Sequence, residues 1–244
     1  MSYLVTGANS GIGLELVTQL SALPTSKVTR VFALVRRSSE ALDALPSDRV
    51  TTIIISNLAD AAEVSKAVAS ATEKLDGKGL DVLINNAGAM EPTGGKFEPT
   101  QKTQDMSAQE LMSTLESNVA TSLVVTSSFL PLLKQGKQKK IFNITTCGAF
   151  HAYKISKAAM NMLNQQFAGE LEAEGFCVAL ITPGWLKSRH PQADLEVSVG
   201  VKAVLDIVFG AGPEQNGKFL NIRVAGWEEN TKGPNKYDGK EIPW

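Results

Sequence analysis

The sequence is poor in cysteine and has no long apolar run. Its two cysteines are too few for a disulfide framework, so Cys147 and Cys177 are expected to be buried free thiols. No apolar segment approaches the ~20 residues needed to cross a bilayer. Because the first strand is expected within a few residues of Met1, we expect no signal peptide. These absences favour a cytosolic protein over a membrane-spanning or disulfide-rich secreted one.

An excess of charge of either sign is also missing. The net charge is −1 and the isoelectric point is about 6.2, so the chain offers no broad basic face for nucleic acid or an anionic membrane. The basic clusters are Arg36-Arg37 and residues 137–140, and we expect the second to lie in a solvated turn before a strand. We therefore expect no nucleic acid or membrane as a partner. We also expect no metal site.

The sequence does contain a regular alternation of strand and helix patterns. With 244 residues, of which 43% are hydrophobic, it can build one substantial core, and we expect a single domain over residues 1–244. The run Ile53-Ile54-Ile55 is typical of the centre of a parallel sheet covered on both faces. The alternation predicts an α/β fold with a Rossmann-type, doubly wound parallel sheet flanked by helices. Early strands are expected at 1–5, 28–35, 53–55 and 80–84, and helices at 59–75, 108–133 and 153–174.

A glycine-rich loop, residues 6–13, stands between the first strand and the first helix. Gly7 permits a tight turn, Gly11 lets the backbone approach a pyrophosphate, and Gly13 allows close packing of the helix. The helix N-terminus adds amide donors and the positive end of its dipole. This order predicts a dinucleotide site, with Asn9, Ser10 and Ile12 as further contacts; a glycine turn without a ligand is the alternative.

Two arginines, Arg36 and Arg37, follow the second expected strand. A dinucleotide fold selective for the unphosphorylated coenzyme would place an acid there to hold the ribose 2′-hydroxyl. Guanidinium groups instead match a 2′-phosphate, so the pair favours NADPH over NADH. A solvated basic pair at a strand end is the competing interpretation.

Tyr153 and Lys157 are four residues apart at the head of a helical pattern and therefore share one face of that helix. An ammonium group beside a phenol favours the phenolate, which would make the phenol a usable proton donor and acceptor near neutrality. This chemistry suits carbonyl reduction. Alone, such a pair has little specificity, because a solvated helix face can carry one by chance.

Four motifs in order resemble the short-chain dehydrogenase/reductase family over essentially the whole chain. They are the Thr-Gly-x-x-x-Gly-x-Gly loop, Asn-Asn-Ala-Gly at 85–88, Tyr-x-x-x-Lys at 153–157 and Pro183-Gly184. Within the family, Pro183-Gly184-Trp185 and the tail Tyr237-Asp-Gly-Lys-Glu-Ile-Pro-Trp244 look most similar to sniffer-type carbonyl reductases and related fungal ketoreductases.

The resemblance implies a role for each matching residue. Tyr153 would be the general acid that protonates the carbonyl oxygen, and Lys157 would bind the nicotinamide ribose and stabilise the phenolate. Asn118 would hold a water of the proton relay, Ser188 would contact the carboxamide, and Asn85 with Gly88 would line the adenosine-side cleft. The remaining expected coenzyme contacts are Asn57, Leu58, Ala87, Pro183, Gly184 and Trp185.

The chain departs from the family pattern beside Tyr153. The family places a serine about a dozen residues before the tyrosine, where it orients the substrate carbonyl. Here Thr146 takes that place, only seven positions before Tyr153. Its hydroxyl can donate the same hydrogen bond, but the methyl group narrows the pocket. The short loop could admit a bulky substrate, or it could misplace Thr146. Asn57 stands where many relatives carry an aspartate, which removes a charge near the adenine.

Two later segments resemble substrate-side structure. Residues 89–105 form a long polar loop after the fourth strand, and residues 185–197 form a possible lid after the sixth, both at the edge of the sheet where ligands bind. Plain surface connections are the alternative. In relatives, the helices expected at 108–133 and 153–174 pair across a dimer axis, so a homodimer is expected.

These observations predict an NADPH-dependent reductase of a ketone or aldehyde. Two alternatives stay open: a dehydratase, isomerase or cyclase on the same fold, which the short loop and Thr146 motivate, and a nucleotide-binding sensor without turnover.

Overall fold

Seven parallel strands form one central sheet in the computed structural model, which describes residues 1–46, 48–89, 102–146, 148, 151–188, 190–229 and 235–243. The strand order is β3-β2-β1-β4-β5-β6-β7, so the chain reverses direction across the sheet between β1 and β4. The strands are β1 (Ser2–Thr6), β2 (Arg30–Val35), β3 (Val50–Ile54), β4 (Val82–Asn85), β5 (Lys140–Ile144), β6 (Cys177–Thr182) and β7 (Phe219–Asn221). The predicted doubly wound α/β fold is confirmed.

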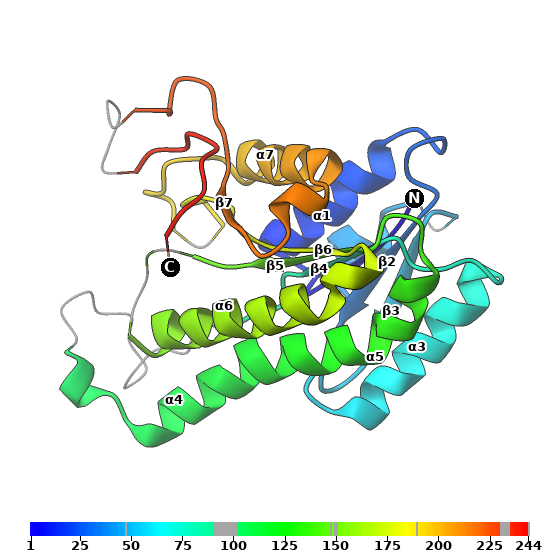
Figure 1. The fold of residues 1–244 in the computed structure, drawn as a ribbon, viewed down its shortest axis with the longest axis horizontal. Coiled ribbons are helices and arrows are strands. Elements are labelled where there is room, and N and C mark those ends of the chain that lie inside the picture. The colour runs from blue at the N-terminus through cyan, green and yellow to red at the C-terminus, as the bar shows by residue number, and fades with distance from the viewer. Residues whose placement is uncertain are drawn as a thin grey trace.

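Helices cover both faces of this sheet (Figure 1). One face carries α1 (Gly11–Ala22) and α7 (Val197–Gly210), and the other carries α3 (Ala61–Leu75), α5 (Thr121–Gln135) and α6 (His151–Leu171). Shorter helices are α2 (Glu40–Asp43) and α4 (Ala108–Leu115), with 3₁₀ turns η2 (Thr103–Asp105), η4 (Glu172–Glu174) and η5 (Pro213–Gln215). Within the described ranges, no helix has both the length and the apolar character needed to cross a membrane.

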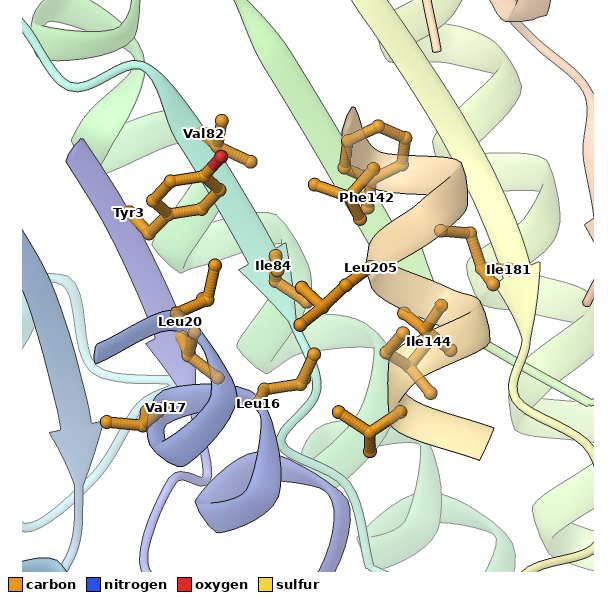
Figure 2. Packing of buried hydrophobic residues seen from close by; sticks show 14 of the residues in the cluster. Tyr3, Leu16, Val17, Leu20, Val82, Ile84, Phe142, Ile144, Ile181 and Leu205 are labelled. Carbon is orange, nitrogen blue, oxygen red and sulfur yellow. The ribbon is translucent and has the colours of Figure 1, made fainter. Parts of the chain in front are cut away.

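Alternate side chains of each strand enter different cores. Tyr3 and Val5 of β1 pack with α1 and α7, whereas Leu4 between them packs on the opposite face. Figure 2 shows the core between the sheet and helices α1 and α7, in which Leu16 approaches the sheet from α1 and Leu205 from α7. The two-sided burial explains the nearly continuous apolar character of the inner strands.

The prediction that residues 53–55 form a central strand is wrong. The strand β3 pairs only with β2 and forms one edge of the sheet, and the side chain of Ile54 is 59% exposed. An apolar run indicates a strand but carries no information on strand order.

The helix expected at residues 108–133 is interrupted. The π-helical turn η3 (Glu116–Ala120) separates α4 from α5, and the amide of Thr121 donates to the carbonyl of Glu116, five residues earlier. Such turns occur frequently at functional sites. The helix expected at 153–174 begins two residues earlier, at His151, and ends in the 3₁₀ turn η4.

Lys140 is buried, and so the expectation of a wholly solvated basic turn at 137–140 is wrong. Its ammonium group donates to the carbonyls of Val208 (3.1 Å) and Phe209 (3.4 Å) at the end of α7, where the negative end of the helix dipole favours a cation. Cys177 is a buried free thiol as predicted, whereas Cys147 lies outside the described residues.

Candidate active site

The glycine loop joins the end of β1 to the start of α1 with very close backbone contacts. Gly7 has φ of +67°, which L side chains rarely adopt, and a Cβ atom there would lie 2.9 Å from Cα of Ala87. A Cβ atom on Gly13 would lie 2.2 Å from the carbonyl oxygen of Gly7. Glycine is therefore required at both positions for the loop to fold back over the first turn of α1.

The N-terminus of α1 is suited to an anion. Ser10 at the N-cap has extended backbone, and its side chain makes no capping hydrogen bond. The first turn contains no acidic residue, so its positive dipole end is not neutralised from within the helix. Asn9, Gly11 and Ile12 are half-buried around this turn, and Ser10 is exposed.

Two residues that the sequence interpretation did not select hold the loop in place. The hydroxyl of Thr6 accepts hydrogen bonds from the amides of Asn86 (3.0 Å) and Ala87 (2.9 Å). The side-chain amide of Asn86 donates back to the carbonyl of Thr6 (3.0 Å). Both residues lie within motifs visible in the sequence, but only their pairing across β1 and β4 gives them this role.

The segment after β2 exposes Arg36 and Arg37, which fits both a phosphate site and a solvated basic pair. Asn57 is exposed after β3, and its side-chain oxygen accepts from the amide of Ala59 (2.9 Å), which stabilises the local turn. Leu58 is buried in the core beneath this edge.

Asn85 differs from the expectation that it lines a cleft, because it is 2% exposed. Its side-chain amide donates to the Thr126 hydroxyl (2.9 Å) and to the side-chain oxygen of Asn143 (3.0 Å). Asn143 in turn donates to Asn164 on α6 (2.8 Å). These buried amides tie β4 and β5 to the helices behind the sheet, so Asn85 supports the site from below.

Tyr153 and Lys157 lie on the first two turns of α6, and the Lys157 Nζ atom is 5.4 Å from the centroid of the Tyr153 ring. Tyr153 is half-buried, whereas Lys157 is 3% exposed and donates to the carbonyl of Ile144 at the end of β5 (2.9 Å). Burial lowers the pKa of Lys157 to about 8. The ammonium form still predominates at neutral pH, so a positive charge stands close to the phenol.

Asn118 in the π-helical turn is buried and clamps the segment that follows β4. Its side chain accepts from the amide of Ala89 (2.8 Å) and donates to the carbonyl of Ala89 (3.0 Å) and to the hydroxyl of Ser156 (2.9 Å). A Cβ atom on the exposed Gly88 would lie 2.9 Å from Oδ1 of Asn118 and 3.5 Å from Nζ of Lys157. Four sequence-predicted residues, Gly88, Asn118, Tyr153 and Lys157, therefore meet at one place.

The hydroxyl of Thr146 bonds within its own loop. It donates to the carbonyl of Gly148 (2.6 Å) and accepts from the amide of the same residue (3.1 Å). To bind a substrate oxygen, this hydroxyl must leave at least one of these partners.

The loop after β6 forms another wall of the same edge. Pro183 is buried, Gly184 has φ of +82°, Trp185 is 39% exposed and Ser188 is exposed. A Cβ atom on Gly11 would lie 3.6 Å from Cβ of Ser188, so this loop reaches across to the glycine loop. Most of the polar loop expected at 89–105, namely residues 90–101, lies outside the described residues.

Among the residues with described positions, no group of three or more His, Cys, Asp or Glu side chains is arranged to hold a metal ion.

The chain is similar to known proteins in sequence and in fold. A sequence model of the family described as short chain dehydrogenase matches residues 2–196. The chain is 31% identical over 176 residues to the C-signal protein of Myxococcus xanthus, covering 68% of this chain and 93% of that protein. It is 34% identical over 203 residues to the short-chain dehydrogenase/reductase atnB of Arthrinium sp, covering 76% of this chain and 74% of that protein.

Two solved structures are also similar. The NADPH-bound carbonyl reductase from chicken fatty liver gives a TM-score of 0.82 at 26% identity, covering 100% of this chain and 94% of that one. The carbonyl reductase Sniffer of D. melanogaster gives a TM-score of 0.81 at 26% identity, covering 100% of this chain and 99% of that one.

Proposed function

Because this chain belongs to the short-chain dehydrogenase family, we propose that it is an NADPH-dependent reductase of a ketone or aldehyde. The observation that carries the proposal is the convergence of Gly88, Asn118, Tyr153 and Lys157 beside the glycine loop. The likeness to two carbonyl reductases supports the substrate class.

The glycine loop fits the pyrophosphate of a dinucleotide. Gly7 and Gly13 leave no room for side chains, and the amides at the N-terminus of α1 point away from the helix without a capping side chain. The carboxyl ends of β1 and β4 flank the reversal of strand order, which is where open α/β sheets bind ligands. Residues of this loop would hold the pyrophosphate, and the exposed Arg36 and Arg37 would hold a 2′-phosphate.

The bound coenzyme would supply hydride to the carbonyl carbon of the substrate. Tyr153 would donate its phenolic proton to the carbonyl oxygen, and the Lys157 ammonium would stabilise the phenolate that remains. Asn118 would fix the backbone of Ala89, which borders the same space, and its contact with Ser156 would hold α6 in position.

Thr146 is the part of this mechanism that the geometry supports least. Its hydroxyl bonds to both backbone groups of Gly148, so Tyr153 would be the main group that orients the substrate carbonyl. We propose that Thr146 assists only after it releases Gly148 on substrate binding.

The proposed function is tested by coenzyme oxidation. The purified protein is given NADPH or NADH with a panel of aromatic ketones, quinones and dicarbonyls, and the absorbance of the reduced nicotinamide is followed. We expect NADPH consumption, and we expect Tyr153→Phe to bind NADPH normally but to lose turnover by a factor of about 10³ or more. Unchanged turnover in Tyr153→Phe would reject the role of this phenol.

A non-redox reaction on the same fold is the second candidate, and the closure of Thr146 on Gly148 favours it. Product formation from a panel substrate without loss of NADPH absorbance would support this candidate. A sensor without turnover is the third; binding of NADPH with no product from any substrate would support it.

We also propose a homodimer through α4, α5 and α6. Large apolar side chains on these helices face solvent, namely Met112, Leu123, Ile155 and Met162, at 62%, 43%, 40% and 49% exposure. Light scattering should give twice the chain mass, and Leu123→Glu should shift the particle toward the monomer. A wild-type monomer at micromolar concentration would contradict the dimer.

A further inference from the structure

The C-terminal segment, residues 235–243, lies antiparallel to β7 and covers the outer edge of the sheet. The amide of Asn221 donates to the carbonyl of Lys240 (2.9 Å), and the amide of Ile242 donates to Phe219 (2.8 Å). We call this segment the tail. Its backbone is fixed to β7 along several residues, so it can serve as a firm support for a neighbouring loop.

Tyr237 of the tail bonds to the loop after β6, which we define as residues 183–188 and 190–196 and call the β6 loop. In Figure 1 the tail is red and the β6 loop is yellow. The Tyr237 side chain is 3% exposed, and its hydroxyl accepts from the amide of Trp185 (3.1 Å) and donates to Oδ2 of Asp194 (2.5 Å). Asn235, also in the tail, donates to the same carboxylate oxygen (2.8 Å). One phenol thus joins both ends of the β6 loop, with a charged acceptor on one side.

The β6 loop is closed on itself at the same place. Leu186 and Leu195 form an isolated bridge, the amide of Lys187 donates to Leu195 (2.9 Å), and the amide of Leu195 donates to Trp185 (3.2 Å). Together with the Tyr237 hydroxyl, these bonds hold residues 185–187 next to residues 194–195, and we call these two stretches the base of the loop. Beyond the base, Ser188 extends toward Gly11 of the glycine loop.

Gly184 shows how closely the ring of Tyr237 fits under the loop. A Cβ atom on Gly184 would lie 2.9 Å from Cε1 of Tyr237, and Gly184 has φ of +82°. The ring also contacts Trp227, with a centroid separation of 5.6 Å. Packing and hydrogen bonding therefore both fix the position at which the β6 loop leaves the sheet.

We propose that Tyr237 and Asp194 clamp the β6 loop over the nicotinamide half of the coenzyme site, which makes both of them positioning residues for coenzyme binding. The inference rests on the proposed function. Arg36 and Arg37 follow β2, which lies on the other side of β1 from β6 and β7, the strands beside the clamp. Loss of the clamp should therefore weaken contacts to one half of the coenzyme and spare the other.

The test compares binding of NADPH with binding of 2′,5′-ADP, which lacks the nicotinamide half, by titration calorimetry. Tyr237→Phe keeps the ring and removes the hydroxyl. We expect it to raise the Kd of NADPH about tenfold, as for loss of a hydrogen bond to a charged group, and to change the Kd of 2′,5′-ADP less than about twofold. Tyr3→Phe is the matched control, because the Tyr3 hydroxyl donates to the sulfur of Met1 (3.6 Å), toward the opposite end of β1 from the glycine loop.

Substitutions of Asp194 separate positioning from general destabilisation. Asp194→Asn retains an oxygen that can accept from Tyr237, so its Kd for NADPH should lie between those of the wild type and Asp194→Ala. Adding Tyr237→Phe to Asp194→Ala should cost less than Tyr237→Phe alone, because the bond to Asp194 is already lost and only the bond from the Trp185 amide remains to be removed.

Each contrary outcome has a separate meaning. A wild-type protein that binds neither NADPH nor NADH overturns the proposed function. A wild type that binds NADPH while Tyr237→Phe shows the same Kd overturns the clamp. Equal weakening of NADPH and 2′,5′-ADP in Tyr237→Phe also overturns it, since that result describes loss of structure throughout the site.

Discussion

Different kinds of contact hold the glycine loop and the substrate edge in shape. We define the substrate edge as the β5–α6 junction together with the β6 loop. In the glycine loop, neighbouring strands interlock: Thr6 and Asn86 exchange hydrogen bonds, and Gly13 packs directly on Gly7. At the substrate edge, Thr146 bonds within its own loop, and the β6 loop depends on a tyrosine from the tail. The coenzyme end is built by direct contacts between neighbouring strands and the loops that follow them, whereas the substrate end depends on a loop that bonds to itself and on side chains from the tail.

The strongest test of this contrast is Gly13→Ala. The added Cβ atom would stand 2.2 Å from a backbone carbonyl that cannot move without opening the loop. We expect a loss of about 3 kcal/mol in unfolding free energy, measured by urea denaturation, and loss of NADPH binding. Gly169→Ala in α6 is the control: a Cβ atom there meets nothing within 4 Å, so stability should rise by about 0.5–1 kcal/mol. A Gly13→Ala protein of wild-type stability would show that the loop is not interlocked.

Asn118→Ala tests the border between the two regions. It leaves both backbone groups of Ala89 and the hydroxyl of Ser156 without the Asn118 side chain as a partner, at a cost of about 2–3 kcal/mol in unfolding free energy. Turnover should fall about a hundredfold, since Ala89 and α6 both lose support. Asn216→Ala removes side-chain contacts with the carbonyl of Ala168 (3.0 Å) and the amide of Val178 (2.9 Å), away from Ala89, and should lower stability while leaving kcat nearly unchanged. Equal kcat values in the two variants would show that Asn118 does not contribute to the catalytic site.

A pH series on the coenzyme-free protein tests the buried charge of Lys157. Burial lowers its pKa to about 8 from an ordinary 10.5, so between these values the unfolded chain binds a proton that the native protein does not. The contribution of Lys157 to the free energy of unfolding therefore rises as the pH increases from about 8 to 10.5. Below pH 8 the native protein bears the full cost of burying the ammonium charge. The wild type should gain about 2 kcal/mol relative to Lys157→Met between pH 7.5 and 9.5.

Urea denaturation at the two pH values measures this difference. Lys202→Met is the control, because it also removes a lysine amine, but one that is exposed beside Asp206. Parallel curves for the wild type and Lys157→Met would contradict a depressed pKa at Lys157.

The sequence predicted the features that local patterns determine. The strand, glycine loop and helix at the N-terminus were found because turn chemistry and periodicity specify them residue by residue, and the α/β fold followed from the alternation. Asn118 and Gly88 were selected only through resemblance to a family, since an isolated asparagine or glycine carries no such signal. Both residues lie close to Lys157 because β4 is next to β5 in the sheet and α6 packs beside them.

Other features were beyond reach for physical reasons. The π-helical turn depends on one amide that bonds five residues back, which leaves no trace in the apolar periodicity. The exposure of Ile54 depends on β3 lying at the edge. The bond between Tyr237 and Asp194 joins residues 43 positions apart, and nothing in either neighbourhood indicates the partner.

The smallest expected effect is that of Thr146→Ala, and it decides how far the substrate edge departs from the family pattern. If the hydroxyl mainly closes the loop on Gly148, its removal should lower kcat less than about tenfold and destabilise the protein by about 1 kcal/mol or less. Thr146→Ser keeps the hydroxyl and should match the wild type in both respects. A group that stabilises the transition state directly would instead cost a factor of about 10² to 10³ in kcat. A loss of that size in Thr146→Ala, with stability intact, would mean that substrate draws the hydroxyl away from Gly148, and that the substrate edge assembles only when the substrate binds.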